Sequence, residues 1–462
     1  MQISDIPHQL PEPTEKMSIP RLYHQRARVF PGTAVVERRS SLGGWQPVTI
    51  EELLADVEIL GRGLIAQGVD VGDKVAILAA TSFEWLLVDL AILSVRAITV
   101  PIYESDSAPQ MEHILEDSDA HLVFTSTSQQ AELVRSVSNE NSVRVDSWDS
   151  GALTVLRKAA SGASVEQFTE RLDALRIDDL ATITYTSGTT GSPKGVELTH
   201  RNFVATANAI HRTVPMIAQN PKTRGLLFLP LAHVLARFVM HTIACGPGVL
   251  ALSPDTSTLL SDLATFQPTS ILAVPRVLEK VYGVAQAKAG GGIKGKLFSW
   301  SVHQAKDASR AQGKTGLGGR GKLALANALV LRKIRAVLGP NLEYIVCGGA
   351  PLPADLAHFF RGASVDILQG YGLSETTGPI TLQAPGNNTP GSVGPVLMGN
   401  EIMINGADGE IRVRGSAVFR GYHNLPEITA ASFENGWFCT GDLGRIDKPG
   451  SSKLLAARRR FW

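Results

Sequence analysis

The sequence predicts an α/β protein with helix-covered parallel sheets and a small β-rich subdomain towards its C-terminal end. Helical and strand-like segments alternate between residues 49 and 103, and strand-like segments separated by helical stretches return between residues 270 and 368. Beyond about residue 379, short strands with Gly, Pro and Asn turns replace this alternation. At 462 residues, 44% of them hydrophobic, the chain exceeds one ordinary core, so we expect two or more lobes.

The first alternation supplies the elements of one sheet. Helices are predicted over residues 50–67 and 83–95, and strands over residues 74–79 and 97–102. Further strands are predicted over residues 270–274, 342–346 and 365–368, and in the β-rich part over 401–406 and 410–415. Alternation of this kind is typical of parallel strands joined by crossover helices.

Composition excludes several classes of protein. The formal net charge of +1 provides no general field for nucleic acid, so we predict no nucleic-acid partner. Three widely separated cysteines, Cys245, Cys347 and Cys439, indicate neither a disulfide framework nor a zinc cluster, and small apolar core positions in a cytoplasmic protein are the simplest interpretation. No signal peptide is expected at the start, and Asp89 and Arg96 interrupt the most apolar region, which favours buried elements over a membrane span.

One segment is strongly basic. Residues 288–322 contain eight Lys or Arg and a single acidic residue, Asp307, with glycine clusters at 290–292 and 316–321. A solvated helical excursion explains this pattern most simply. The alternative is a basic surface that attracts ligand phosphates or an anionic membrane face, which would make the protein peripheral to the membrane.

A glycine-rich stretch, YTSGTTGSPKG at residues 185–195, points to phosphate chemistry. A strand is predicted over 180–185 and a helix over 200–211 with Thr199 as its cap, so the order is strand, glycine loop, helix. The Walker pattern fails, because Gly188 is followed after four residues by Pro-Lys-Gly. Glycines, hydroxyls and Lys194 are nonetheless suited to an anion, while a plain surface turn is an equally open interpretation of the loop alone.

Four further stretches accompany this loop in a known order: LPLAHVLAR at 229–237, GGAPL at 348–352, QGYGLSET at 369–376 and GWFCTGDLGRID at 436–447. Together they resemble the adenylate-forming (AMP-binding) superfamily. The resemblance is closest to long-chain fatty acid–CoA ligases, through AVPRVLEKVY at 273–282, the form of the tyrosine motif and a long insertion before Cys347. It implies a large N-terminal adenylating core with two helix-covered sheets and a small distorted β-barrel.

The implied reaction uses ATP, Mg²⁺ and coenzyme A. A long-chain fatty acid carboxylate attacks the α-phosphate of ATP, releases pyrophosphate, and passes from AMP to the thiol of coenzyme A. The resemblance assigns phosphate binding to Thr186, Ser187, Gly188, Thr189, Thr190, Gly191 and Lys194. It assigns Mg²⁺ to Thr186 and Glu375, and the nucleotide base and its surroundings to Gly348, Gly349, Ala350, Pro351, Gln369, Gly370, Tyr371, Gly372 and Ser374.

Two more residues complete the implied site. Asp442 resembles the aspartate that binds both ribose hydroxyls, and His233 resembles the histidine near the α-phosphate and the acyl carboxylate. His233, Lys194 and Glu375 are the implied catalytic group. For Val234, Phe238 and Val239, candidate walls of an acyl tunnel, the core interpretation is preferred.

The family pattern stops near Asp447. We expect residues 1–442 to form the AMP-binding core, with the β-rich subdomain at about 380–440, and residues 443–462 to be a hinge remnant and an atypical tail without the C-terminal lid. Arg458, Arg459 and Arg460 are expected in a solvated tail with no strand. A frame shift or a degenerate gene end would explain the change.

Two main hypotheses follow. The chain is a long-chain fatty acid–CoA ligase, or it is a truncated, weakly active or silent remnant that binds ATP and acyl groups. A third, weaker interpretation is an adenylating domain for an amino or aryl acid. Acyl-chain length and oligomeric state are not predicted.

Overall fold

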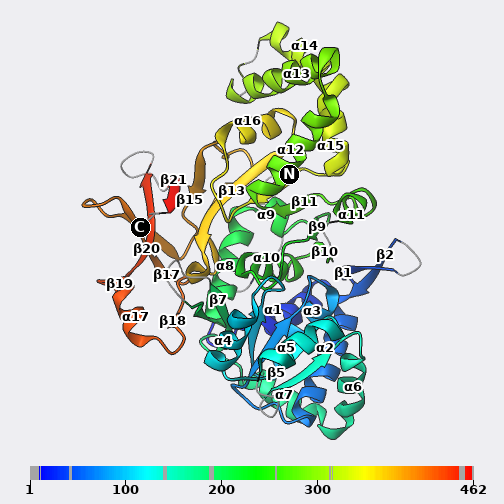
Figure 1. Cartoon of the computed structure of the whole chain (residues 1–462), viewed down its shortest axis with the longest axis vertical. Helices are drawn as coiled ribbons and strands as arrows, with labels where there is room; N and C mark the ends of the chain where they lie inside the picture. Colours follow the sequence, from blue (N-terminus) through cyan, green and yellow to red (C-terminus); the bar gives the residue numbers. More distant parts are fainter. Residues whose placement is uncertain are drawn as a thin grey trace.

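The computed structural model describes residues 10, 12–40, 44–138, 143–186, 192–254, 257–311, 314 and 316–446, together with the backbone of 453–459. Two large mixed sheets and one smaller antiparallel sheet organise these residues (Figure 1). The α/β class and the helix-covered sheets predicted from the sequence are confirmed.

The seven-stranded sheet has the order β18-β8-β7-β4-β3-β5-β6. Its strands are β3 (Lys74–Leu78), β4 (Ile98–Ile102), β5 (Ala120–Thr125), β6 (Arg144–Ser147), β7 (Leu180–Thr186), β8 (Lys194–Thr199) and β18 (Gly421–Tyr422). The helices in this part of the chain are α1 (Ile19–Val29), α2 (Ile50–Ala66), α3 (Phe83–Ser94), α4 (Ala108–Ser118), α5 (Ser128–Val137), α6 (Ala152–Ala159), η2 (Ala160–Gly162), α7 (Val165–Ala174) and α8 (His200–Thr213). The pairs from β4 to β6 are parallel, whereas β7, β8 and β18 pair antiparallel.

The eight-stranded sheet has the order β14-β13-β12-β11-β9-β10-β1-β2. Its strands are β1 (Ala34–Arg39), β2 (Trp45–Thr49), β9 (Arg224–Leu227), β10 (Val249–Leu252), β11 (Ser270–Ala273), β12 (Tyr344–Cys347), β13 (Asp366–Leu373) and β14 (Gly378–Leu382). Between them lie α9 (Pro215–Ala218), α10 (Val234–Ala244), α11 (Leu259–Phe266), α12 (Pro275–Ala289), α13 (Gly292–Arg310), α14 (Leu317–Ala326), η3 (Asn327–Leu331), α15 (Arg332–Leu338) and α16 (Ala354–Gly362). The predicted strand at 365–368 extends into the tyrosine motif and ends at Leu373.

The third sheet corresponds to the predicted β-rich subdomain. Its strands are β15 (Ser392–Pro395), β16 (Asn400–Ile404), β17 (Glu410–Gly415), β19 (Phe433–Glu434), β20 (Trp437–Ile446) and β21 (Lys453–Arg459), and helix α17 (Pro426–Ala431) precedes β19. The short helix η4 (Ser374–Thr376) lies between β13 and β14 instead. One expectation was wrong here: Arg458 and Arg459 lie in a strand, because β21 pairs antiparallel with β15 and β20. Arg460 is outside the described residues.

The largest core cluster lies where the two large sheets share helices. It combines buried residues of α3, α8 and α10 with residues of strands from both sheets, including Ile77 of β3, Leu250 of β10 and Leu368 of β13. Packing on both sides explains why α3 is apolar all around, with Asp89 among its buried residues. A second cluster lies between the eight-stranded sheet and helices α12, α13 and α16. A third lies between the seven-stranded sheet and helices α4 and α5.

The basic segment forms the helices α13 and α14, which project at one end of the molecule (Figure 1). Ile293 and Leu317 are 86% and 87% exposed there. No described helix is long and apolar enough to cross a membrane. Cys245 and Cys347 are buried as expected, whereas Cys439 is only half-buried.

Candidate active site

The glycine-rich stretch begins at the end of β7 and returns in β8, so the expected order of strand, loop and helix is wrong. β8 intervenes before α8, which begins at His200 with the predicted cap Thr199. Thr186 and Lys194 are partners in the antiparallel register, which places their side chains close together on one face. Ser187, Gly188, Thr189, Thr190 and Gly191 lie outside the described residues.

Helix α4 holds both ends of this hairpin. The Tyr185 hydroxyl donates to Asp117 Oδ2 at 2.6 Å, and His113 Nε2 contacts the Pro193 carbonyl at 2.8 Å, which requires that this nitrogen donate. The His113 and Tyr185 rings also meet edge to face, 6.2 Å apart. The positions of Thr186 and Lys194 are therefore fixed from a helix about 75 residues upstream, a long-range contact that no local sequence pattern indicated.

Lys194 and Glu375, which belong to different sequence motifs, meet on Tyr422. Lys194 Nζ lies 5.1 Å from the centre of the Tyr422 ring, and the Tyr422 hydroxyl donates to Glu375 Oε1 at 2.9 Å. Burial and the Glu375 charge raise the pKa of Tyr422, so its hydroxyl stays protonated as a donor. The backbone of Glu375 is fixed as well, because its carbonyl accepts from Phe419 N at 2.8 Å. Sequence reasoning missed Tyr422, which lies in no motif of the resemblance.

The tyrosine and aspartate motifs are in direct contact. The Tyr371 hydroxyl of β13 donates to Asp442 Oδ2 of β20 at 2.9 Å. Burial, and then the Asp442 charge, raise the pKa of Tyr371 well above its ordinary value. The two side chains are 9% and 4% exposed, so a nucleotide could reach only their edges in this conformation.

The GGAP segment follows β12 and lies beside helix α10. Gly349 has a φ of +79°, a conformation that favours glycine. A Cβ on Gly348 would lie 3.4 Å from Leu235 Cδ2, so the segment approaches the first turn of α10 closely. Gln369, in contrast, is buried and its backbone N donates to the side chain of Gln383 at 3.0 Å, which is a structural contact.

His233 is the N-cap of α10. Its Nδ1 accepts from Leu235 N at 3.2 Å, so Nδ1 carries no proton and the neutral ring presents an Nε2–H donor. The Tyr103 ring meets it edge to face at 6.3 Å. Desolvation by surrounding protein lowers the pKa of His233, which favours the neutral ring.

The candidate walls of an acyl tunnel lie in or against the main core. Val234 and Phe238 are buried in the main core, which agrees with the core interpretation, and Val239 is half-buried against it. Among the described residues, no group of three or more His, Cys, Asp or Glu side chains is arranged to hold a metal ion. One carboxylate with one hydroxyl, Glu375 with Thr186, still suits Mg²⁺, which commonly binds proteins through one or two carboxylates and completes its shell with water and substrate phosphates.

Comparison with known proteins agrees with these motifs. The AMP-binding enzyme family matches residues 23–423. The chain is 41% identical over 434 residues to the long-chain-fatty-acid–CoA ligase FadD15 of Mycobacterium bovis, covering 92% of this chain and 72% of the relative. Long chain acyl-CoA synthetase 3 of Arabidopsis thaliana is 28% identical over 98% of this chain and 73% of its own length. The fold matches the N-terminal domain of FACL13 from Mycobacterium tuberculosis with a TM-score of 0.72 and 23% identity, covering 96% of this chain and 100% of that one.

Proposed function

The chain belongs to the AMP-binding enzyme family, and we propose on that premise that it is a long-chain fatty acid–CoA ligase. ATP activates the fatty acid as an acyl-adenylate, and coenzyme A then takes the acyl group. The observation that carries the proposal is the contact of two motifs through Tyr422, which brings a cation, Lys194, and a carboxylate, Glu375, to one place. A cation and a metal-type carboxylate side by side are what a triphosphate requires.

The residues have the following proposed roles. Lys194, with the hydroxyls of the preceding loop, neutralises the phosphates that leave as pyrophosphate. His233 donates its Nε2–H to an oxygen of the α-phosphate or of the acyl carboxylate, because its other nitrogen is occupied by the helix cap. The carboxylate oxygen forms the new bond to the α-phosphorus while the bond to pyrophosphate breaks. Tyr371 and the GGAP segment receive the base, and Asp442 receives the ribose.

Glu375 and Thr186 are the proposed holders of Mg²⁺, which would supply charge neutralisation for the phosphates when bound. Tyr422 fixes Oε1 of Glu375, and among the described residues no side-chain hydrogen bond to Oε2 competes with a metal ion. In the second half-reaction the coenzyme A sulfur bonds to the acyl carbon, AMP leaves, and the thiol proton is released.

Domain limits and membrane contact belong to the same proposal. We place the limits of the adenylating core at residues 1–442, so that β15, β16, β17, β19 and the first part of β20 form its β-rich part, while the end of β20 and β21 lie beyond it. The α13–α14 excursion combines exposed Ile293 and Leu317 with lysines, including Lys294 and Lys296, so an anionic bilayer is a suitable surface for it. Co-sedimentation with phosphatidylglycerol vesicles, lost in K294E/K296E and absent with phosphatidylcholine alone, tests this; equal binding by the variant contradicts it. Cytoplasmic location stays a prediction.

Palmitate-dependent ATP–pyrophosphate exchange and acyl-CoA formation test the activity. The 462-residue chain is assayed over a series of fatty acids beside a version that carries the C-terminal segment of a relative. We expect exchange with long-chain acids and its loss in K194A, with K222A, an exposed lysine away from the site, as the control. Binding of ATP without either signal in both versions would support the silent remnant instead.

A further inference from the structure

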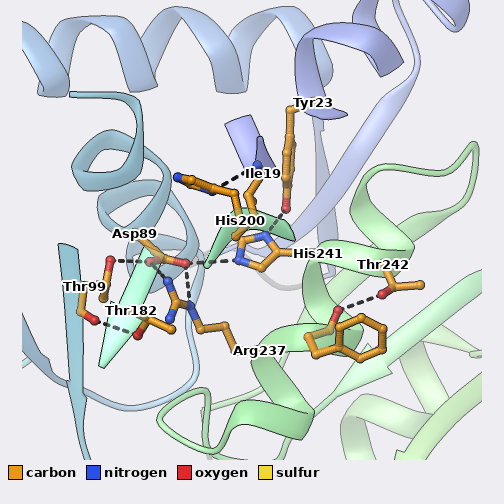
Figure 2. Close-up of polar contacts among 10 residues, drawn as sticks. Ile19, Tyr23, Asp89, Thr99, Thr182, His200, Arg237, His241 and Thr242 are labelled. Atoms are coloured by element: carbon orange, nitrogen blue, oxygen red, sulfur yellow. Dashed lines mark hydrogen bonds and ion pairs between the residues drawn. The ribbon is translucent and has the colours of Figure 1, made fainter. Parts of the chain in front are cut away.

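A buried polar cluster, which we call the Asp89 cluster, lies among the helices shared by the two large sheets (Figure 2). Asp89 of α3 is 0% exposed and accepts four hydrogen bonds. Arg237 Nη2 and Thr99 Oγ1 donate to Oδ1 at 2.6 and 2.7 Å, and Arg237 Nε and His241 Nε2 donate to Oδ2 at 2.9 and 3.2 Å. Every lone-pair site of this carboxylate is therefore used.

The cluster continues to α1. Because the carboxylate can only accept, His241 Nε2 carries the proton and His241 Nδ1 accepts from the Tyr23 hydroxyl at 2.9 Å. Burial lowers the pKa of His241, which keeps the ring neutral. Burial would raise the pKa of Asp89, but Arg237 and His241 lower it to about 2, so the carboxylate remains charged.

Stability alone is a weak reason for such a pair. Replacing a buried ion pair by apolar side chains of similar volume is often neutral or stabilising, because two desolvated charges regain little from each other. Arg237 is also incompletely satisfied: its Nη1 has no partner among the described residues. The rings of Trp85 and Phe203, at 5.6 and 5.5 Å, hold the guanidinium from α3 and α8. These contacts fix the position of the Arg237 guanidinium, although removing this charge from water is unfavourable.

Arg237 lies one helical turn after His233. Its backbone N donates to the His233 carbonyl at 3.1 Å, and the same first turn supplies Leu235 N to His233 Nδ1. A rotation or shift of α10 would therefore change both the direction of the imidazole and the bond that selects its tautomer. Phe203, which packs on the Arg237 guanidinium, belongs to α8. Helix α8 directly follows β8, the strand that begins at Lys194, so Arg237 also contacts the segment that carries this lysine.

We propose that Arg237 and Asp89 are positioning residues that hold the first turn of α10, and through it the Nε2–H of His233, against the reacting groups. Neither side chain reaches the substrate; both act through the helix that carries the histidine. The kinetic test of this inference rests on the proposed function. A second test, which measures the tautomer of His233, needs no turnover.

The kinetic test is a double-mutant cycle on acyl-adenylate formation from ATP and palmitate. R237K keeps the charge but cannot donate to both Asp89 oxygens from a planar fork. We expect R237K to lower the rate constant of adenylation by about tenfold to a hundredfold, with the KM for ATP little changed, because a displacement near 1 Å costs this much in a positioned reaction. In an H233A background R237K should cost nothing further. R224K is the control, since Arg224 makes a similar two-bond contact to Glu37, at 2.8 and 2.9 Å, in another part of the fold.

Independent losses that multiply in the double variant would overturn the proposal, as would equal losses in R224K. If R237K does not fold by circular dichroism, T99V, which removes one donor to Asp89, takes its place in the same cycle. If the wild-type chain makes no adenylate, the proposed function fails and ¹⁵N NMR of His233 decides the positioning. The wild type should show the Nε2–H tautomer and R237K a mixture; an unchanged tautomer overturns the inference.

Discussion

Gly372, in the middle of the tyrosine motif, provides the sharpest test of the site geometry. A Cβ at this position would lie 1.7 Å from the Gly378 carbonyl oxygen and 2.9 Å from Pro379 Cα, both backbone atoms of the neighbouring strand β14. Reaching ordinary van der Waals contact, about 3.5 Å, requires the two strands to separate by more than 1.5 Å. Overpacking of this kind typically costs about 1–3 kcal/mol and occasionally more, and here it falls between Tyr371 and Glu375.

A series of glycine-to-alanine variants turns this distance into a ranking. In G370A the new Cβ meets Thr381 O at 2.8 Å, whereas in G348A its nearest neighbour is a flexible Leu235 methyl group at 3.4 Å. The thermal unfolding midpoint should decrease relative to the wild type in all three variants, least in G348A, more in G370A and most in G372A. ATP binding by calorimetry should weaken most in G372A, because Tyr371 and Glu375 move with the strand. A G372A midpoint equal to that of G348A would refute the close packing of β13 on β14.

Three further predictions concern single polar contacts. Y371F removes the donor to Asp442, worth about 1.5–3 kcal/mol for a charged acceptor, and should weaken ATP binding by about tenfold in calorimetry. Burial lowers the pKa of His200 from 6.5 to about 3, so below pH 6.5 the unfolded chain binds a proton that the native protein does not. The free energy of unfolding therefore falls as the pH drops below 6.5. Measured by urea unfolding, H200N should lose about 2 kcal/mol less of this free energy than the wild type between pH 7 and pH 5. Y422F frees Glu375, and the Mg²⁺ concentration for half-maximal adenylation should rise by about tenfold.

Each of these predictions has a result that would contradict it. Unaltered ATP affinity in Y371F would mean that Asp442 is held by other groups. H303N, at an exposed histidine, should keep the wild-type dependence of stability on pH, and a similar dependence in H200N would contradict the assignment. If Y422F kept the wild-type Mg²⁺ dependence, Tyr422 would have no part in the proposed Mg²⁺ site.

Local patterns predicted only part of the helices and strands, but they placed several of these closely. Alternation of helices and strands in the first hundred residues reappears in α2, β3, α3 and β4 within two residues at each end, because each segment buries a continuous apolar face. The glycine loop was misplaced for a local reason as well: residues 194–199 read as part of the loop and its exit, but the antiparallel pairing with β7 makes them a strand.

The contacts that assemble the site could not be predicted in this way. Tyr422 contacts both Lys194, 228 residues earlier, and Glu375, 47 residues earlier. Helix α4 binds the β7–β8 hairpin from about 70 to 80 residues upstream. The motifs predict which residues a nucleotide would meet. Packing between distant elements decides which of them share a hydrogen bond, as with Tyr371 and Asp442.

The core shared by the two large sheets has a consequence for how the molecule opens. Since α3, α8 and α10 pack on both sheets at once, neither sheet can lose its structure while the other keeps it, and the backbone amides of these helices should exchange with deuterium only in the rarest openings. Helix α14, whose buried residues reduce to Ala326, should exchange orders of magnitude sooner. His233 thus caps a helix in the slowest-exchanging part of the protein. Its imidazole should therefore keep its position and its hydrogen bond while the outer helices open and close.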